Sequence, residues 1–159
     1  MCADRLREIG YKICTLENLG NSNTITVSQP LELKNTTLEH LLNEIVAQNP
    51  GYHWEKVKDD LVNIFPIQSV LDTKVPNFNI RNKGAWLILN QDLEIEKMGI
   101  SLFNEFGEEK GPLISLNLES TDLRGALNTI VSQLDKAIWH ISGNPGAYFL
   151  TISSIPHNS

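Results

Sequence analysis

Residues 31–48 read LELKNTTLEHLLNEIVAQ, and residues 116–133 read LNLESTDLRGALNTIVSQ. Aligned at a constant offset of 85 and extended to residues 54 and 139, the two stretches share ten identities, seven of them apolar. The shared residues of the first copy are Leu31, Leu33, Thr36, Leu38, Leu42, Asn43, Ile45, Val46, Gln48 and Trp54. Because the repetition is mainly of packing residues, it predicts two copies of one structural module rather than duplicated chemistry.

Each copy contains the pattern of an amphipathic helix. From Leu38 the apolar residues fall at i, i+3, i+4, i+7 and i+8, and the same spacing recurs from Leu123. Thr36 followed by Glu39 has the spacing of a capping box, and Thr121 is its counterpart in the second copy. We therefore expect a helix to begin just after each threonine.

Strands are expected on both sides of each helix. Alternating apolar residues precede the helices, and a hairpin pattern follows each of them. Upstream, each copy has a helix end and a strand, and the second copy also has a leading strand. The expected strands are residues 11–17, 31–34, 52–57 and 61–65 in the first copy, and 75–81, 100–106, 116–118, 137–142 and 147–153 in the second.

The predicted fold is α+β, with tandem duplicated β-α-β-β-α-β-β modules of which the first lacks its leading strand. The first module spans residues 1–74 and the second spans residues 75–159, with the boundary inside PIQSVLDTKV at residues 66–75. A helix is also expected around residues 86–97, although its apolar residues do not form a single stripe. Each half carries a net charge of -3, which agrees with duplication.

Composition and charge narrow the functional class. The chain has 159 residues, is 41% hydrophobic and 20% charged, and carries a net charge of -6. These values are typical of a globular protein, and no apolar run approaches the ~20 residues of a membrane helix. A scattered minority of basic residues argues against nucleic-acid binding, which requires clustered Lys and Arg.

Cellular location and the state of the cysteines stay open. Residues 1–10 lack the basic and apolar regions of a signal peptide, so the chain is either cytoplasmic or a mature fragment with a new start Met. Cys2 and Cys14 are the only cysteines. They form a disulfide in an exported protein, or Cys14 is simply an apolar strand residue.

No residue set in the sequence points to catalysis, a metal or a cofactor. None of the four histidines pairs with another at i+3 or i+4, and the acidic pairs at residues 59–60 and 108–109 fall in expected turns. The GxxG at residues 143–146 joins two expected strands without basic neighbours, which indicates a hairpin turn rather than a nucleic-acid clamp. We therefore expect the protein not to be an enzyme and to hold no cofactor.

The apolar spacing [I/L]xLxLxxxxLxxxLxxIV, an aromatic-bearing strand and a final strand running into NIFP at residues 63–66 carry a family resemblance. The pattern resembles the short N-terminal domain shared by bacterial secretins and TonB-dependent receptors, and it covers most of the chain as two tandem copies. The resemblance implies a bacterial α+β interaction module in the periplasm or elsewhere outside the cytoplasm. It supplies no catalytic residues.

Two functional hypotheses follow. The first is a non-enzymatic protein-protein interaction or assembly module, which binds another protein or itself through unpaired edge strands. The second is a small-molecule binding or sensing protein with a site between the two copies, lined by Trp86 and Phe103. The repeated Trp54 and Trp139 are expected in the core, whereas Trp86, which has no partner in the other copy, is the better candidate for a surface residue. Binding residues should lie where the copies differ, and the candidates are Trp86, Phe103, Phe106 and Tyr148.

Overall fold

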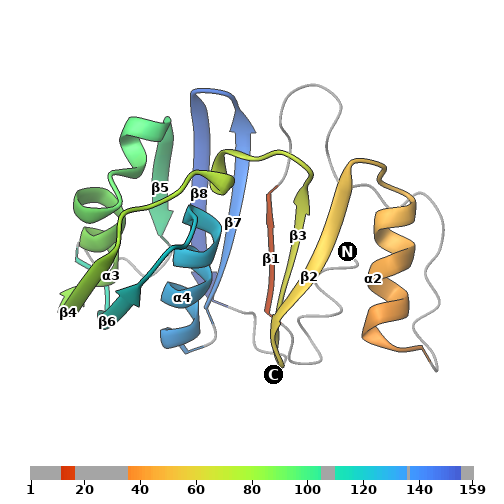
Figure 1. Ribbon diagram of the computed structural model, residues 1–159, viewed down its shortest axis with the longest axis horizontal. Helices are drawn as coiled ribbons and strands as arrows, with labels where there is room; N and C mark the ends of the chain where they lie inside the picture. Colours follow the sequence, from red (N-terminus) through yellow and green to blue (C-terminus); the bar gives the residue numbers. More distant parts are fainter. Residues whose placement is uncertain (1–11, 17–35, 105–109, 136, 155–159) are drawn as a thin grey trace.

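The computed structural model describes residues 12–16, 36–104, 110–135 and 137–154. It confirms the α+β class: one six-stranded sheet runs through both halves of the sequence, and helices pack on its faces (Figure 1). The strands are β1 (Lys12–Leu16), β2 (Tyr52–Lys58), β3 (Leu61–Pro66), β4 (Phe78–Gly84), β5 (Ile100–Asn104), β6 (Leu113–Leu118), β7 (Ala137–Asn144) and β8 (Ala147–Ser154). The helical segments are α2 (Leu38–Ala47), η1 (Val70–Asp72), α3 (Ala85–Leu87), η2 (Ile88–Asp92), η3 (Ile95–Met98) and α4 (Leu123–Gln133).

The strand order in the large sheet is β2-β3-β1-β7-β8-β5, and β4 and β6 form a separate antiparallel pair. Strand β1 joins the halves, because it pairs in parallel with β3 on one side and with β7 on the other. Within each half the hairpin is antiparallel, and the remaining strand lies parallel to the second strand of that hairpin. The halves predicted at residues 1–74 and 75–159 therefore share a single sheet.

Helix α2 covers one face of the first half. Its apolar stripe, Leu41, Leu42 and Ile45, is buried, and these residues cluster with Ile13 and Val62 from the sheet. The helix begins one residue later than predicted, because Thr37 rather than Thr36 is the N-cap. The side chain of Thr37 accepts the backbone N–H of His40, which satisfies one of the free donors of the first turn.

Helix α4 covers the opposite face of the same sheet. Successive side chains of a strand point to opposite faces, and in β3 the residues Val62 and Ile64 pack with α2, whereas Asn63 bonds to Asn128 of α4. All six residues of β3 are buried. The third strand of the first half is thus enclosed by a helix from each half of the chain.

The larger core lies in the second half. It gathers α4, the buried faces of β7 and β8, and the β4–β6 pair, where β6 alternates between exposed and buried residues. Here too the N-cap is one residue later than predicted: Asp122, and not Thr121, accepts the backbone N–H of Gly125. In both copies the N-cap is the residue that directly follows the predicted threonine.

The helix predicted around residues 86–97 is broken into three short segments. Residues 85–87 form one turn of α-helix, residues 88–92 form a π-helical turn, and residues 95–98 form a 3₁₀ turn. Glu94 and Gly99 both have left-handed backbone conformations, with φ of 46° and 74°. The irregular apolar spacing explains the break, because Ile88, Leu89, Leu93 and Ile95 are all buried although no straight helix places them on one face.

The predicted boundary near residues 66–75 is not a loose linker. Ser69 caps η1 through a capping box with Asp72, and Leu71 is fully buried in the larger core. Backbone bonds then tie this segment to the start of α4: Val75 donates to Thr121, and Leu123 donates to Thr73.

The hairpin strands and β5 begin at the predicted residues. Strand β4 begins at residue 78 instead of 75, and β6 begins at residue 113, before the predicted Leu116. The strand predicted at residues 31–34 and the helix end at residues 5–10 lie outside the described residues. No helix in the described ranges is long and apolar enough to cross a membrane. The duplication itself stays a prediction, although each half contributes three strands in the same order to the sheet.

Candidate functional site

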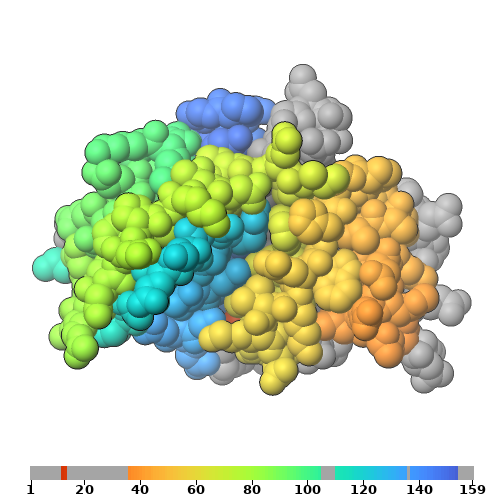
Figure 2. All heavy atoms as spheres, viewed as in Figure 1, coloured from red at the N-terminus to blue at the C-terminus, as the bar shows by residue number. Residues whose placement is uncertain are grey.

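A groove of about 690 Å³ lies between α4 and the β2–β3 hairpin. Figure 2 shows this side of the molecule, where the yellow hairpin meets the cyan and blue residues of β6 and α4. Alternate residues of β2 form one wall, because His53, Glu55 and Val57 share a face of the strand. Residues spaced by four on α4 form the other wall; they are Arg124, Asn128 and Ser132, with Gly125, Thr129 and Gln133.

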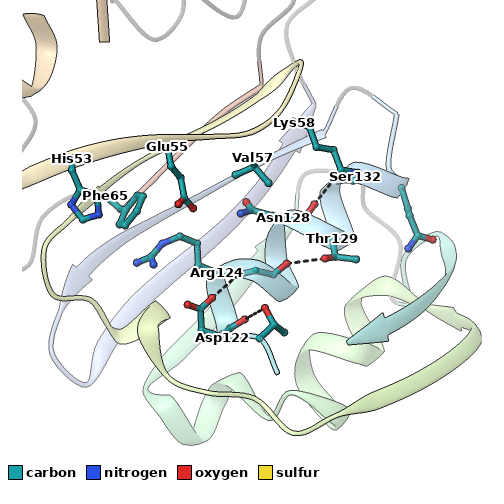
Figure 3. Close-up of a pocket in the computed structure, with 13 residues that line it drawn as sticks. His53, Glu55, Val57, Lys58, Phe65, Asp122, Arg124, Asn128, Thr129 and Ser132 are labelled. Carbon is teal, nitrogen blue, oxygen red and sulfur yellow. Dashed lines mark hydrogen bonds between the residues drawn. The ribbon is translucent and has the colours of Figure 1, made fainter. Parts of the chain in front are cut away.

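Arg124 is the most unusual residue of the groove, since its side chain is charged yet only 5% of the residue is exposed. One terminal nitrogen lies 2.7 Å from a carboxylate oxygen of Asp72, and the guanidinium carbon lies 3.9 Å from the centre of the Phe65 ring. His53 makes an edge contact with the same ring at 3.9 Å. In Figure 3 the Arg124 side chain extends from α4 towards these two rings of the hairpin.

Two donors of this guanidinium are left unused. Nε and the second terminal nitrogen of Arg124 are buried and have no hydrogen-bond partner among the described residues. A buried donor without a partner costs free energy, and such groups stand out in folded proteins for that reason. Nε and a terminal nitrogen on one edge of a guanidinium match the two oxygens of a carboxylate.

A fully buried amide network closes the floor of the groove. Asn63 and Asn128 exchange two hydrogen bonds of 3.0 and 2.6 Å, and the indole N–H of Trp139 donates to the same Asn128 oxygen at 3.0 Å. Asn63 belongs to the first half of the chain, and the other two residues belong to the second. The network therefore fixes α4 against β3 across the junction of the halves.

The hydroxyl groups in the groove are engaged in their own helix. Thr129 donates to the carbonyl of Gly125, and Ser132 donates to the carbonyl of Asn128. Both hydroxyls therefore already donate a hydrogen bond within α4. Within the described ranges, no three His, Cys, Asp or Glu side chains lie close enough together to share a metal ion.

The two ends of the sheet form a second candidate site. Strands β2 and β5 are the outermost strands of the described sheet. Large apolar side chains are exposed on both: Val57 on β2, and Phe103, which is 60% exposed, on β5. An edge strand with free backbone groups can accept a further strand from another chain.

The structure separates the four predicted binding residues. Phe103 is exposed on β5, whereas Phe106 lies outside the described residues. Tyr148 is buried. The expectation that Trp86 lies at the surface is wrong, because it is only 1% exposed and packs against Gly111 in the larger core. Neither Trp86 nor Phe103 lines the groove between the halves.

The repeated tryptophans make the same contact in both halves. Trp54 donates its indole N–H to Asn43 at 2.9 Å, and Trp139 donates to Asn128 at 3.0 Å. Both asparagines were among the identities of the sequence repeat, which is therefore partly a repeat of a hydrogen bond. The surroundings differ, since Trp139 is fully buried and Trp54 is half-buried.

Sequence reasoning did not identify the groove residues. Arg124, Phe65 and Asp72 come from three separate segments, and no local pattern links them. One usable signal was present: Asn43 and Asn128 form one of the three polar identities of the repeat, and a polar residue repeated beside an apolar helix stripe implies a specific partner. No protein-family model, curated protein or solved structure matches this chain.

Proposed function

We propose that the chain consists of two copies of one α+β module and acts as a non-enzymatic interaction or assembly protein that binds through the edges of its sheet. The observation that carries this proposal is the β1–β7 junction, where a strand of one half extends the sheet of the other in parallel. The chain thus already contains one example of module joining by strand addition.

The proposed equivalence of the modules draws on two observations. The strand order β2-β3-β1 in the first half corresponds to β7-β8-β5 in the second. The Trp–Asn hydrogen bond between the hairpin and the helix is present in both, with the same separation of 11 residues. Shared ancestry of two modules gives both features a single cause.

The edges are suited to binding because their backbone groups lack strand partners within the described sheet. Main-chain hydrogen bonds supply affinity in strand addition, and side chains on the edge select the partner. Phe103 is exposed in the middle of β5, and neither β5 nor β8 carries a charged residue. Natural edge strands commonly use charge to prevent pairing, so β5 lacks that protection.

The resemblance to secretin and TonB-dependent receptor domains remains a proposal, supported only by apolar spacing and capping residues. On that resemblance we propose a bacterial protein that works in the periplasm. A partner in that compartment, or a second copy of the chain, would bind at the sheet edge.

Affinity capture with matched baits tests the proposal. The wild-type chain and Phe103→Lys are used as baits in the same extract, and Ile67→Lys is the control, because Ile67 is an exposed apolar residue outside the strands. We expect a bound protein to be recovered by the wild type and the control and to be lost with Phe103→Lys. Recovery that is identical for all three baits would contradict binding through β5.

A second candidate function is supported by the free donors of Arg124. The groove would then bind a small molecule that carries a carboxylate, held by Nε and the free terminal nitrogen of Arg124. Ligand binding at 100 times Kd stabilises the fold by about 2.7 kcal/mol. For a chain of this size the melting temperature should rise by roughly 5–10 °C.

A thermal-shift series tests this alternative. Acetate, succinate and citrate are compared with succinamide, which has the carbon chain of succinate but carries no charge. A shift with a carboxylate that disappears in Arg124→Met would support the groove as a binding site. Equal melting temperatures across the panel, or a shift that persists in Arg124→Met, would rule out this role for Arg124.

A further inference from the structure

The halves are related in a way that leaves the two ends of the sheet complementary. Taking the direction of β1 as up, the strands across the sheet run down, up, up in the first half and up, down, down in the second. The helices α2 and α4 also lie on opposite faces. A twofold rotation about an axis that lies in the sheet and is perpendicular to the strands, combined with a translation along that axis, relates the first half to the second. This operation reverses the strand directions and moves the helix to the opposite face of the sheet.

Applying the same operation again gives an open-ended series. At the junction the last strand of one half, β1, pairs in parallel with the first strand of the next half, β7. The counterpart of β1 is β5, and the counterpart of β7 is β2. These are the two outermost strands of the described sheet, so each end of the chain presents one partner of the junction.

We infer that the partner at the sheet edge is a second copy of this chain, whose β2 pairs in parallel with β5 and repeats the internal junction head to tail. This inference rests on the proposed function and names its partner. Two operations restore the original strand direction, so successive chains point the same way, and the contact is heterologous and does not close on itself.

Exposure of β8 supports this arrangement. Each Trp faces an isoleucine across its hairpin, Trp54 with Ile64 and Trp139 with Ile152, which aligns β3 with β8. Leu61 of β3 then corresponds to Phe149 of β8. Leu61 is 1% exposed because it lies in the core that contains α4, whereas Phe149 is 58% exposed.

Phe103 lies on the same open face as Phe149. Phe103 pairs with Thr151 and Ser101 pairs with Phe149, so the two aromatic residues are two positions apart on one face of adjacent strands. On the opposite face, Tyr148 and Leu150 are buried in the core. The open face therefore carries two exposed aromatic side chains, with Ser101 and Thr151 beside them, at the end of the sheet where a second chain would add.

The matching surface on α2 is more exposed than its counterpart on α4. In the first half, Asn43 is exposed, and Leu38, Val46 and Trp54 are only half-buried. Their counterparts in the second half, which pack across the internal junction, are buried; they are Asn128, Leu123, Val131 and Trp139. In a second copy placed by the same operation, α2 would pack over Phe149 and Phe103. The exposed residues of α2 would then be buried, as their counterparts on α4 are.

The internal junction also fixes the register. Thr15 pairs with His140 there. Thr15 pairs with Ile64 and Asn104 pairs with Ile152, and these isoleucines face the tryptophans of their hairpins, so Asn104 corresponds to Thr15. Glu55 corresponds to His140, because each directly follows the tryptophan of its half. Asn104 should therefore pair with Glu55 of the second copy. Open twisted sheets rarely exceed about 10 strands without curling, so short or coiled oligomers are expected.

Mixed disulfide cross-linking tests the inference. Asn104→Cys and Glu55→Cys are made in separate chains, checked for native circular dichroism, mixed and oxidised. Cys2 and Cys14 are present in every sample, so only a band that needs both new cysteines is scored. We expect a covalent dimer in the mixture and not with either variant alone. Adding Phe103→Lys to the Asn104→Cys chain should lower its yield about tenfold, as for the loss of one buried aromatic side chain, and Ile67→Lys should not.

Ser101→Cys mixed with Glu55→Cys is the matched register control. Ser101 is three residues from Asn104, about 10 Å along the strand, which is beyond the Cα separation of about 7 Å that a disulfide allows. Cross-linking of this pair as efficient as that of the first, or cross-linking of a single variant with itself beyond that of the wild-type chain, would overturn the head-to-tail register. So would the absence of any mixed dimer.

The outcomes separate this inference from the function on which it rests. If no mixed dimer forms while a different protein is captured by the wild type and lost with Phe103→Lys, self-assembly is wrong and edge binding stands. If capture and cross-linking are both insensitive to Phe103→Lys, binding through β5 is wrong as well.

Discussion

Replacing Asn128 by alanine should be among the most destabilising single changes in this chain. The substitution removes three hydrogen bonds at once, two with Asn63 and one from Trp139. It leaves the amide oxygen and nitrogen of Asn63 and the indole nitrogen of Trp139 without partners. Both residues are fully buried, so none of the three groups is solvated in the folded protein as it stands.

The expected magnitude follows from these three groups. A buried polar group that loses its partner costs about 1–3 kcal/mol. Asn128 lines the groove, so water can replace part of its side chain and the lower end of the range applies. We therefore expect Asn128→Ala to lower the free energy of unfolding by about 3 kcal/mol.

The first half provides a matched control. Asn43 occupies the corresponding helix position and accepts one hydrogen bond, from Trp54, at an exposed site. Its removal leaves the indole N–H accessible to water, so Asn43→Ala should cost about 0.5–1.5 kcal/mol. The two variants delete the same atoms from the same repeated motif, and they differ in burial and in the added contact with Asn63.

Urea unfolding at low protein concentration, followed by tryptophan fluorescence, measures both changes. With an m value of about 2 kcal/mol/M, the midpoint should fall by about 1.5 M for Asn128→Ala and by about 0.5 M for Asn43→Ala. Adding Asn63→Ala to Asn128→Ala should cost less than Asn63→Ala alone, because the partner is already missing. Equal midpoints for the Asn128 and Asn43 variants would refute the buried network.

Further substitutions test the packing and the cap of α4. Gly111→Ala should lower the free energy of unfolding by more than about 2 kcal/mol, and Gly51→Ala by only about 1 kcal/mol. Both glycines have positive φ, but an added Cβ at Gly111 would lie 2.7 Å from the Trp86 ring, whereas one at Gly51 meets nothing within 4 Å. Equal urea midpoints for the two variants would contradict this placement of Trp86. Leu42→Ala should cost about 2–5 kcal/mol, since Leu42 is fully buried between α2 and the sheet, and a melting temperature within 2 °C of the wild type would show that α2 does not pack there. Asp122→Ala should cost about 1 kcal/mol through loss of the α4 cap, which calorimetry can measure, and a serine at this position should restore most of the loss if capping is the cause.

The sequence repeat predicted the elements of each half well. Helical spacing from Leu38 and from Leu123 located α2 and α4, and the turn residues located both hairpins. The caps were each placed one residue early. Thr36 has the capping-box spacing with Glu39 and Thr121 aligns with Thr36, but in both copies the following residue is the cap and has the required extended backbone. Local patterns give the type of an element more reliably than its end.

The union of the halves in one sheet could not be predicted from local patterns. The two halves of the sheet are continuous through the backbone pairing of β1 with β7, and such pairing leaves no periodic signal in either strand. The groove depends on this union, because Phe65 belongs to the first half and Arg124 to the second. Trp86 was placed at the surface for lack of a repeat partner, yet the broken helical segment that follows turns its side chain into the core.

Light scattering across a range of concentrations tests the central claim most directly. If the chain assembles through its sheet edges, the mass of the wild type rises above that of one chain as concentration increases, while Phe103→Lys keeps the mass of one chain under the same conditions. A wild-type mass that equals one chain at every concentration, or a rise that Phe103→Lys does not reduce, would contradict assembly through β5.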